Sequence, residues 1–179
     1  VYGDIREKIA TEDIDIINPG LYGQTKYFGE KILQEIKPTI SLRMPGVIGV
    51  GSHGWIDGVY KRLKNNETLS IFNSPYNHVI HVLDIYGIIR QICDTEYFKT
   101  ECFNVCAGGM STSLEVVEFI KEELSSKSFI DVKEQDGGVT YVISNKKLLK
   151  IYSPMDVKNA ISLYVREMNN ELIEKGFFP

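Results

Sequence analysis

Helical and extended patterns alternate along this chain, and few folds accommodate that order. Residues 21–37 have the apolar spacing of an amphipathic helix, which Pro38 ends because a proline cannot continue it. The apolar stripe of this helix is Leu21, Thr25, Phe28, Ile32 and Ile36. We expect a strand at 39–44, helices at 56–64 and 81–94, and a short strand buried on both faces at 102–106. This alternation predicts an α/β fold with parallel strands.

Boundary signals continue toward the C-terminus. Thr112 and Glu115 form a capping box that begins a helix, whose core side is supplied by Leu114, Val117, Ile120 and Leu124. A strand is expected at 139–143 and a helical turn at 144–149. The last helix is predicted from Ser153 as N-cap, Pro154 at the first helical position, Asp156 in the first turn and Gly176 past its end.

Composition excludes several classes of function. The chain has 179 residues, enough for one domain or one and a half, and carries a net charge of −4 with scattered basic residues, which argues against nucleic-acid binding. It contains no apolar run near the ~20 residues that span a bilayer. Three cysteines indicate a reducing compartment rather than a disulfide framework, so we expect a cytoplasmic protein.

Tyr22 and Lys26 are the main candidates for chemistry. Four residues apart, they lie on one face of the predicted helix, where an ammonium can sit beside a phenol. A free phenol has a pKa of about 10, so half-ionisation at pH 7 requires a shift of roughly 3 units, or about 4 kcal/mol. One cation at ~4 Å in a site of effective dielectric ~20 supplies a comparable energy. The alternative is a surface tyrosine that packs over a lysine stem.

A series of motifs in fixed order surrounds this pair. They are Val1-Tyr2-Gly3, Gly29-Glu30, residues 42–49 (LRMPGVIG), His81-Val82-Leu83-Asp84, Phe103-Asn104-Val105 and Gly108-Gly109. Together with the Tyr-x-x-x-Lys pair they resemble the extended short-chain dehydrogenase/reductases, the NAD(P)-dependent epimerase/dehydratase group that acts largely on nucleotide-activated sugars. The resemblance extends from residue 1 to about residue 150. Members of that group carry a glycine-rich cofactor loop, and a serine or threonine, before the Val-Tyr-Gly motif. We therefore expect this chain to be the C-terminal portion of a longer enzyme.

The resemblance implies a division into two parts. Residues 1–50 and 82–112 would form the second half of a Rossmann-type parallel sheet, and residues 51–81 and 113–179 a small α/β substrate-binding subdomain. The helix that carries the Tyr-x-x-x-Lys pair lies in a dimer interface in such proteins. Its side chains Phe28, Ile32 and Ile36 suit that interface and suit an ordinary core equally well.

The resemblance also assigns the cofactor site. Tyr22 would be the general acid/base for hydride transfer, and Lys26 would bind the nicotinamide ribose of NAD or NADP and lower the pKa of Tyr22. Pro45, Gly46 and Val47 would lie against the nicotinamide. The glycines that follow have the spacing of a phosphate loop, but the next helix begins too late for one. A glycine-rich turn without a ligand is the alternative.

The segment 50–80 corresponds to the substrate loop. We expect substrate contacts from His53, Asn73 and Asn77. Two features depart from the sugar epimerases of the group: Asn77 and His78 stand where an arginine grips the nucleotide phosphates, and Gly46 replaces a common asparagine. These departures leave room for a reductase or a dehydratase.

Several polar residues are better explained as structural. Asp84 would stabilise a helix N-terminus, and His78 with His81 has no partner at a convincing spacing, so no metal site is expected. Cys102 and Cys106 would be buried apolar residues.

Three hypotheses follow. The first is an epimerase, dehydratase or reductase of a nucleotide-activated sugar, present as a truncated chain. The second is a catalytically inactive fragment or binding module that another chain completes, because half of a parallel sheet leaves a strand edge without a partner. The third is an atypical reductase of small alcohols or ketones. In each case we expect association, as a homodimer or through the sheet edge.

Overall fold

The computed structural model describes residues 1–3, 5, 9–95, 99–133 and 141–169. Its helices are α1 (Leu21–Ile36), α2 (Trp55–Lys64), α3 (Val82–Asp94), α4 (Ser113–Glu123) and α5 (Val157–Met168), with a 3-10 turn η1 (Leu148–Lys150). Its strands are β1 (Ile9–Ala10), β2 (Ile40–Arg43), β3 (Gly46–Ile48), β4 (Leu69–Phe72), β5 (Pro75–Tyr76), β6 (Val79–His81), β7 (Glu101–Asn104), β8 (Ser111–Thr112), β9 (Ile130–Lys133) and β10 (Val142–Ile143).

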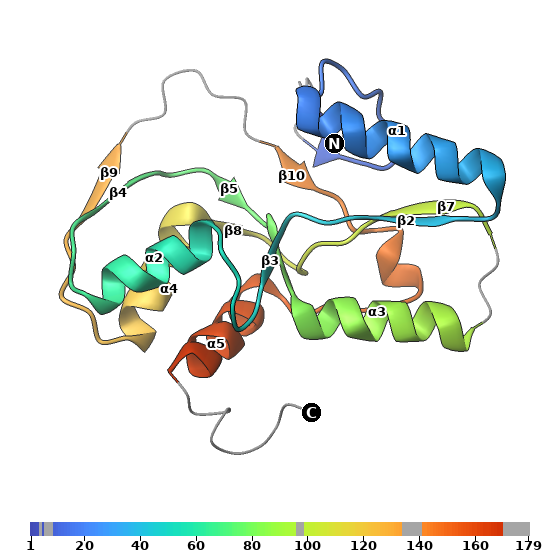
Figure 1. Cartoon of the computed structure of the whole chain (residues 1–179). Helices are drawn as coiled ribbons and strands as arrows, with labels where there is room; N and C mark the ends of the chain where they lie inside the picture. Colours follow the sequence, from blue (N-terminus) through green and yellow to red (C-terminus); the bar gives the residue numbers. More distant parts are fainter. Residues whose placement is uncertain (4, 6–8, 96–98, 134–140, 170–179) are drawn as a thin grey trace.

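The strands pair mostly in parallel, as the alternating pattern predicts. The pairs β2–β7, β3–β6, β4–β9 and β1–β10 are parallel, and β5–β8 is antiparallel. Ile40 pairs with Glu101 at the start of β2–β7, and Arg43 pairs with Asn104 at its end. Helices α1 and α3 lie on opposite sides of this pair (Figure 1). The predicted α/β fold with parallel strands is therefore confirmed.

Two apolar clusters form the main core. The larger one joins α2, α4 and α5 to β4 and β6, and it includes Leu63, Val117, Ile120, Ile161 and Tyr164. The smaller one is formed by side chains of β6, α3, β7 and η1 and of the residue after β7. Its members are Ile80, Ile88, Phe103, Val105 and Leu148. The division into parts at residues 50, 82 and 112 stays a prediction.

Helix α1 is nearly as predicted in extent, and its apolar side chains, expected to suit either a dimer interface or a core, are exposed. Gly23 is its only buried residue. All five members of its apolar stripe are exposed: Thr25, Leu21 by 80%, Phe28 by 59%, Ile32 by 57% and Ile36 by 69%. The stripe therefore does not contribute to a core within this chain.

The start of the last helix was predicted incorrectly. Its N-cap is Asp156 rather than Ser153, and the Asp156 carboxylate accepts a hydrogen bond from the backbone N–H of Asn159 at 2.8 Å. The preceding residues are held extended against Gly108, whose N–H donates to the Met155 carbonyl at 2.8 Å. The helix ends at Met168, and Gly176 lies outside the described residues.

Other boundaries agree or differ by a few residues. The capping box of Thr112 and Glu115 is present, and Val116 is a buried residue of that helix that the expected core side omitted. The strand expected at 102–106 is β7, which begins one residue and ends two residues earlier, and the turn expected at 144–149 is reduced to η1 at Leu148–Lys150. The strand expected at 139–143 is reduced to β10, with residues 139 and 140 outside the described part.

The largest omission lies in the segment expected to be the substrate loop. Its helix α2 was expected at 56–64, but its three strands, β4, β5 and β6, were not. Their short length hides the period-2 pattern, although β4 alternates buried and exposed residues along its four positions. Within the described ranges, no helix is long and apolar enough to cross a membrane.

Candidate active site

A hollow of about 310 Å³ lies between β3, the start of α2 and the strands β5 and β6. Its walls are Gly46, Val47, Ile48, Ser52, His53, Gly54, Trp55, Ile56, Asp57, Tyr76, His78 and Val79. It brings together Gly46 and Val47, which were predicted to contact the cofactor, and His53, which was predicted to contact the substrate. The structure thus places parts of the two predicted sites around one space.

A glycine-rich turn connects β3 to the start of α2, two elements that line the hollow. Strand β3 pairs with β6 from Gly46 to Ile48, and Gly49 and Gly51 then take positive φ angles of 155° and 81°. A Cβ at Gly49 would lie 2.8 Å from Val82, so a side chain does not fit there. The N–H of Ser52 donates to the Gly49 carbonyl at 3.0 Å, and α2 begins only at Trp55. The segment is therefore a turn, and it places Trp55, the first residue of α2, beside the hollow.

Aromatic side chains form one wall. The rings of Trp55 and Tyr76 have centroids 4.9 Å apart, and those of Tyr76 and His78 lie at 6.0 Å. The ring of Tyr141, which does not line the hollow, lies 5.1 Å from that of His78. The His78 Nε2 lies 2.8 Å from the carbonyl oxygen of Tyr141, and burial lowers the pKa of His78, which favours the neutral ring. Burial also raises the pKa of Tyr76. The wall is thus uncharged and aromatic, with neighbouring rings tilted by 45° and 49° to one another, so a flat ring can stack on the face of one ring at a time.

Sequence reasoning did not select Trp55 or Tyr76 as site residues. Tyr76 and His78 flank Asn77 at a spacing of two, which puts both side chains on one face of an extended segment. That alternation was a usable signal. The approach of Trp55 from the start of α2, 21 positions earlier, has no local signal.

Asp57 supplies a fixed negative charge next to the wall. It is 6% exposed, and its carboxylate accepts hydrogen bonds from Lys61 Nζ at 2.8 Å and from the Tyr164 hydroxyl at 3.2 Å. Burial, and then the charge of Asp57, raise the pKa of Tyr164. The imidazole of His53 lies 4.0 Å from the same carboxylate, with its side chain 85% exposed. His53 therefore borders the opening of the hollow.

The two asparagines predicted to contact substrate lie elsewhere. Asn77 is 5% exposed, and its amide binds the backbone of Ile143 twice, donating to the carbonyl at 2.7 Å and accepting from the N–H at 3.0 Å. These two hydrogen bonds engage the side-chain amide of Asn77 and connect the start of β6 to β10. Asn73 is exposed between β4 and β5 and does not line the hollow. Pro45 directly precedes β3.

Tyr22 and Lys26 are neighbours on α1, as their spacing predicts. The Lys26 ammonium lies 5.2 Å from the centre of the Tyr22 ring, and the ring is 73% exposed. The ammonium therefore contacts the face of the phenol. The catalytic roles of both residues stay predictions.

The remaining candidates have structural contacts. Asp84 accepts hydrogen bonds from the Tyr152 hydroxyl at 3.0 Å and the Met155 N–H at 3.1 Å. Burial raises the pKa of Cys102 to about 11 and that of Cys106 to about 12, so both are thiols at neutral pH. In the part of the chain that the structure describes, no three His, Cys, Asp or Glu side chains gather in a way that would hold a metal ion.

Solved structures match this fold, although no family model and no curated protein matches the sequence. The dTDP-glucose 4,6-dehydratase of Bacillus anthracis, in complex with NAD, matches with a TM-score of 0.74 at 19% identity over 96% of this chain and 60% of that chain. The UDP-N-acetylglucosamine 4-epimerase of Methanobrevibacter ruminantium M1 has a TM-score of 0.77 at 18% identity, with coverages of 96% and 60%. A dTDP-4-dehydrorhamnose reductase of Clostridium acetobutylicum has 0.75 at 14%, with coverages of 94% and 62%.

At these identities the matches show the fold. The chain has the Rossmann-like fold found in nucleotide-sugar epimerases, dehydratases and reductases, and it spans about 60% of the length of the three structures named. The resemblance predicted from the sequence motifs is thereby confirmed for the architecture.

Proposed function

We propose that this chain is the substrate-binding portion of an NAD(P)-dependent epimerase, dehydratase or reductase of a nucleotide-activated sugar. The observation that carries the proposal is the hollow, in which the start of β3, predicted to contact the cofactor, meets aromatic rings on which a planar group can stack. The matched fold supports the same class.

The residues at the start of β3 fit a nicotinamide ring. A Cβ at Gly46 would approach the His78 carbonyl to 3.3 Å, so glycine keeps this edge of the hollow open. Val47 is 39% exposed and offers an apolar surface beside it. When bound, the cofactor would accept or donate the hydride. Tyr22 would take or return the proton of the substrate hydroxyl at its phenol oxygen, and the Lys26 ammonium would stabilise the phenolate.

The aromatic wall would hold the nucleobase. Trp55 and Tyr76 are adjacent rings tilted by 45°, and stacking of a base on one aromatic side chain is worth about 1–3 kcal/mol. The carboxylate of Asp57 is already paired with Lys61 and Tyr164, so it does not place an unpaired negative charge next to a phosphate group of the ligand. His53, at the opening, is placed to contact a polar part of the ligand.

The fluorescence of Trp55 tests this proposal directly, because it is the only tryptophan in the chain. We expect UDP- and dTDP-sugars to change its emission, with NADH and NADPH titrated alongside. The Tyr76→Ala variant should weaken the response about tenfold, by loss of roughly 1.4 kcal/mol of stacking. Tyr86→Ala, which removes an exposed tyrosine on α3, is the matched control and should leave it unchanged. A flat titration with every nucleotide at millimolar concentration would reject the proposal.

A binding module completed by another chain is the second candidate. Among the described residues, β2 pairs with one strand, β7, and the apolar stripe of α1 is exposed. An unpaired strand edge and an exposed apolar helix face both favour association. We expect a homodimer through α1, or pairing along the free edge of β2. Sedimentation of Phe28→Glu, beside the unmodified chain, separates these two arrangements, since only the α1 contact should be lost. A monomer at high concentration would exclude both.

A further inference from the structure

Helix α1 is attached to the rest of the molecule with little apolar packing. Gly23 is the only buried residue among its 16 positions, and Tyr22, Phe28, Ile32 and Ile36 are all more than half exposed. A helix normally draws its stability in a protein from a buried apolar face. The position of α1 must therefore depend on other contacts.

The main polar contact is an ion pair between Glu30 of α1 and Arg43 of β2. Arg43 Nη2 lies 2.8 Å from Glu30 Oε1, and Arg43 Nε donates to Glu30 Oε2 at 3.1 Å. Both side chains are 8% exposed. Two parallel hydrogen bonds between a guanidinium and a carboxylate fix the orientation of both groups as well as their distance.

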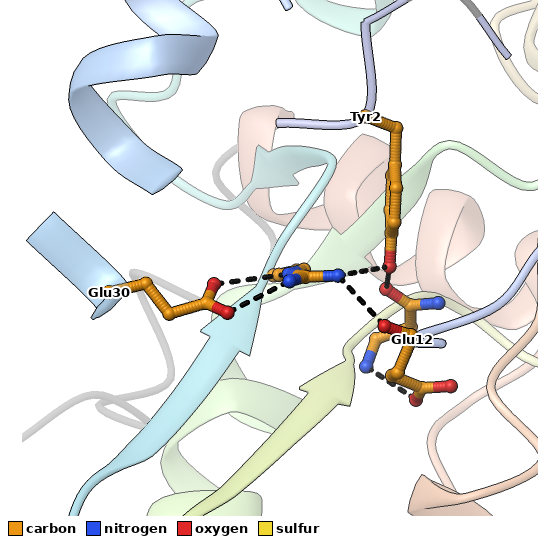
Figure 2. A network of polar contacts seen from close by, with 5 residues as sticks. Tyr2, Glu12 and Glu30 are labelled. Atoms are coloured by element: carbon orange, nitrogen blue, oxygen red, sulfur yellow. Dashed lines mark hydrogen bonds and ion pairs between the residues drawn. The ribbon is translucent and has the colours of Figure 1, made fainter. Parts of the chain in front are cut away.

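The same guanidinium holds the N-terminal segment (Figure 2). Arg43 Nη1 donates to the Tyr2 hydroxyl at 3.2 Å and to the Glu12 carbonyl at 3.3 Å. The Tyr2 hydroxyl donates in turn to the side-chain oxygen of Asn104, and the N–H of Asn104 donates to the Glu12 carboxylate at 2.8 Å. Arg43 thus joins α1, the segment before it and the ends of β2 and β7.

We propose that Arg43 is a positioning residue that sets the orientation of α1 through Glu30, and with it the placement of Tyr22 and Lys26. Glu30 follows Tyr22 and Lys26 at steps of four, so the three residues form one row along the helix. The importance of that placement rests on the function proposed above.

Helix geometry shows why such an anchor matters. At 1.5 Å per residue, Tyr22 lies about 12 Å along the axis from Glu30, so a tilt of ~10° at the anchor moves it by about 2 Å. Errors of about 1 Å in catalytic geometry are costly. Arg43, the last residue of β2, also lies two residues before Pro45. Its side chain therefore links the Tyr-x-x-x-Lys helix to the segment between β2 and β3 that was predicted to contact nicotinamide.

Hydrogen–deuterium exchange of the 179-residue chain without nucleotide tests the proposal. Glu30→Gln removes the charge and keeps the shape, whereas Arg43→Lys keeps the charge and loses the paired hydrogen bonds. We expect exchange in residues 21–36 to become about tenfold faster in both variants, with α4 and α5 unchanged. The matched control is Arg90→Gln, which removes the exposed Arg90–Asp94 pair of α3 and should change nothing in α1.

Rescue separates a positioning role from a general loss of stability. The double variant Glu30→Arg/Arg43→Glu restores opposite charges, and it should recover part of the protection of α1. Unchanged α1 exchange in both single variants would overturn the proposal, as would an equal increase in α1, α4 and α5. Should Glu30→Gln fail to fold by circular dichroism, Arg43→Lys still provides the comparison. Since no nucleotide is used, failure here is distinguishable from absence of nucleotide binding.

Discussion

Replacing Asn77 by alanine tests whether this residue is a structural connection rather than a substrate ligand. The change leaves the Ile143 N–H and carbonyl without the partners that now lie at 3.0 and 2.7 Å. Each buried backbone group that loses its partner costs about 1–3 kcal/mol, and Ile143 is partly buried, so we expect the free energy of unfolding to fall by roughly 2–4 kcal/mol. The β1–β10 pair contains two residues from each strand and offers little to compensate.

Urea unfolding followed by circular dichroism measures this loss. Asn73→Ala is the matched control, because Asn73 is exposed and its replacement should change stability by less than about 0.5 kcal/mol. Asn77→Ala with control-like stability and an abolished response of Trp55 to nucleotide would refute the structural argument. It would return Asn77 to the substrate site.

Three further outcomes are expected. Gly87→Ala places a Cβ 2.5 Å from the Tyr152 hydroxyl oxygen and should cost about 1–3 kcal/mol in urea unfolding, whereas Gly58→Ala in α2 meets no atom within 4 Å and should stabilise the chain by about 0.5–1 kcal/mol. Burial lowers the pKa of His78, so its neutral form is favoured in the folded state; its contribution to stability should be complete above the ordinary pKa of about 6.5 and fall as the pH drops through the lowered value. Urea midpoints at pH 7 and 5 should therefore differ less in His78→Gln, and an equal difference would contradict this. Thr112→Ala removes the capping box of α4 and should cost about 1 kcal/mol, with an unchanged melting temperature as the contrary result.

Local chemistry made much of the secondary structure predictable. Pro38 cannot continue a helix, and α1 ends two residues before it. Thr112 and Glu115 are complementary donors and acceptors three residues apart, so their capping box depends on one turn of backbone alone. Ser153 misled the prediction because Gly108, distant in the sequence, keeps the backbone extended through Met155 and leaves Asp156 as the N-cap.

The candidate site could be predicted only in part. Tyr22 and Lys26 are neighbours because one helical turn separates them, and Gly46 and Val47 follow from the motif after β2. The meeting of Trp55 with Tyr76 requires α2 to pack beside β5, which no residue near Trp55 encodes. The occupation of Asn77 by Ile143 requires β10 to lie beside the start of β6, 66 positions later in the chain.

The sequence by itself determined the α/β class, the limits of α1, the capping of α4 and the adjacency of Tyr22 and Lys26, because each follows from backbone geometry and side chains within a few residues. Only the tertiary structure decided which side chains share the hollow and that Asn77 is buried. It also decided that the apolar stripe of α1 is exposed while Glu30 is buried on Arg43. Apolar spacing marks the face of a helix that favours burial, but whether another element covers that face depends on the packing of the whole chain.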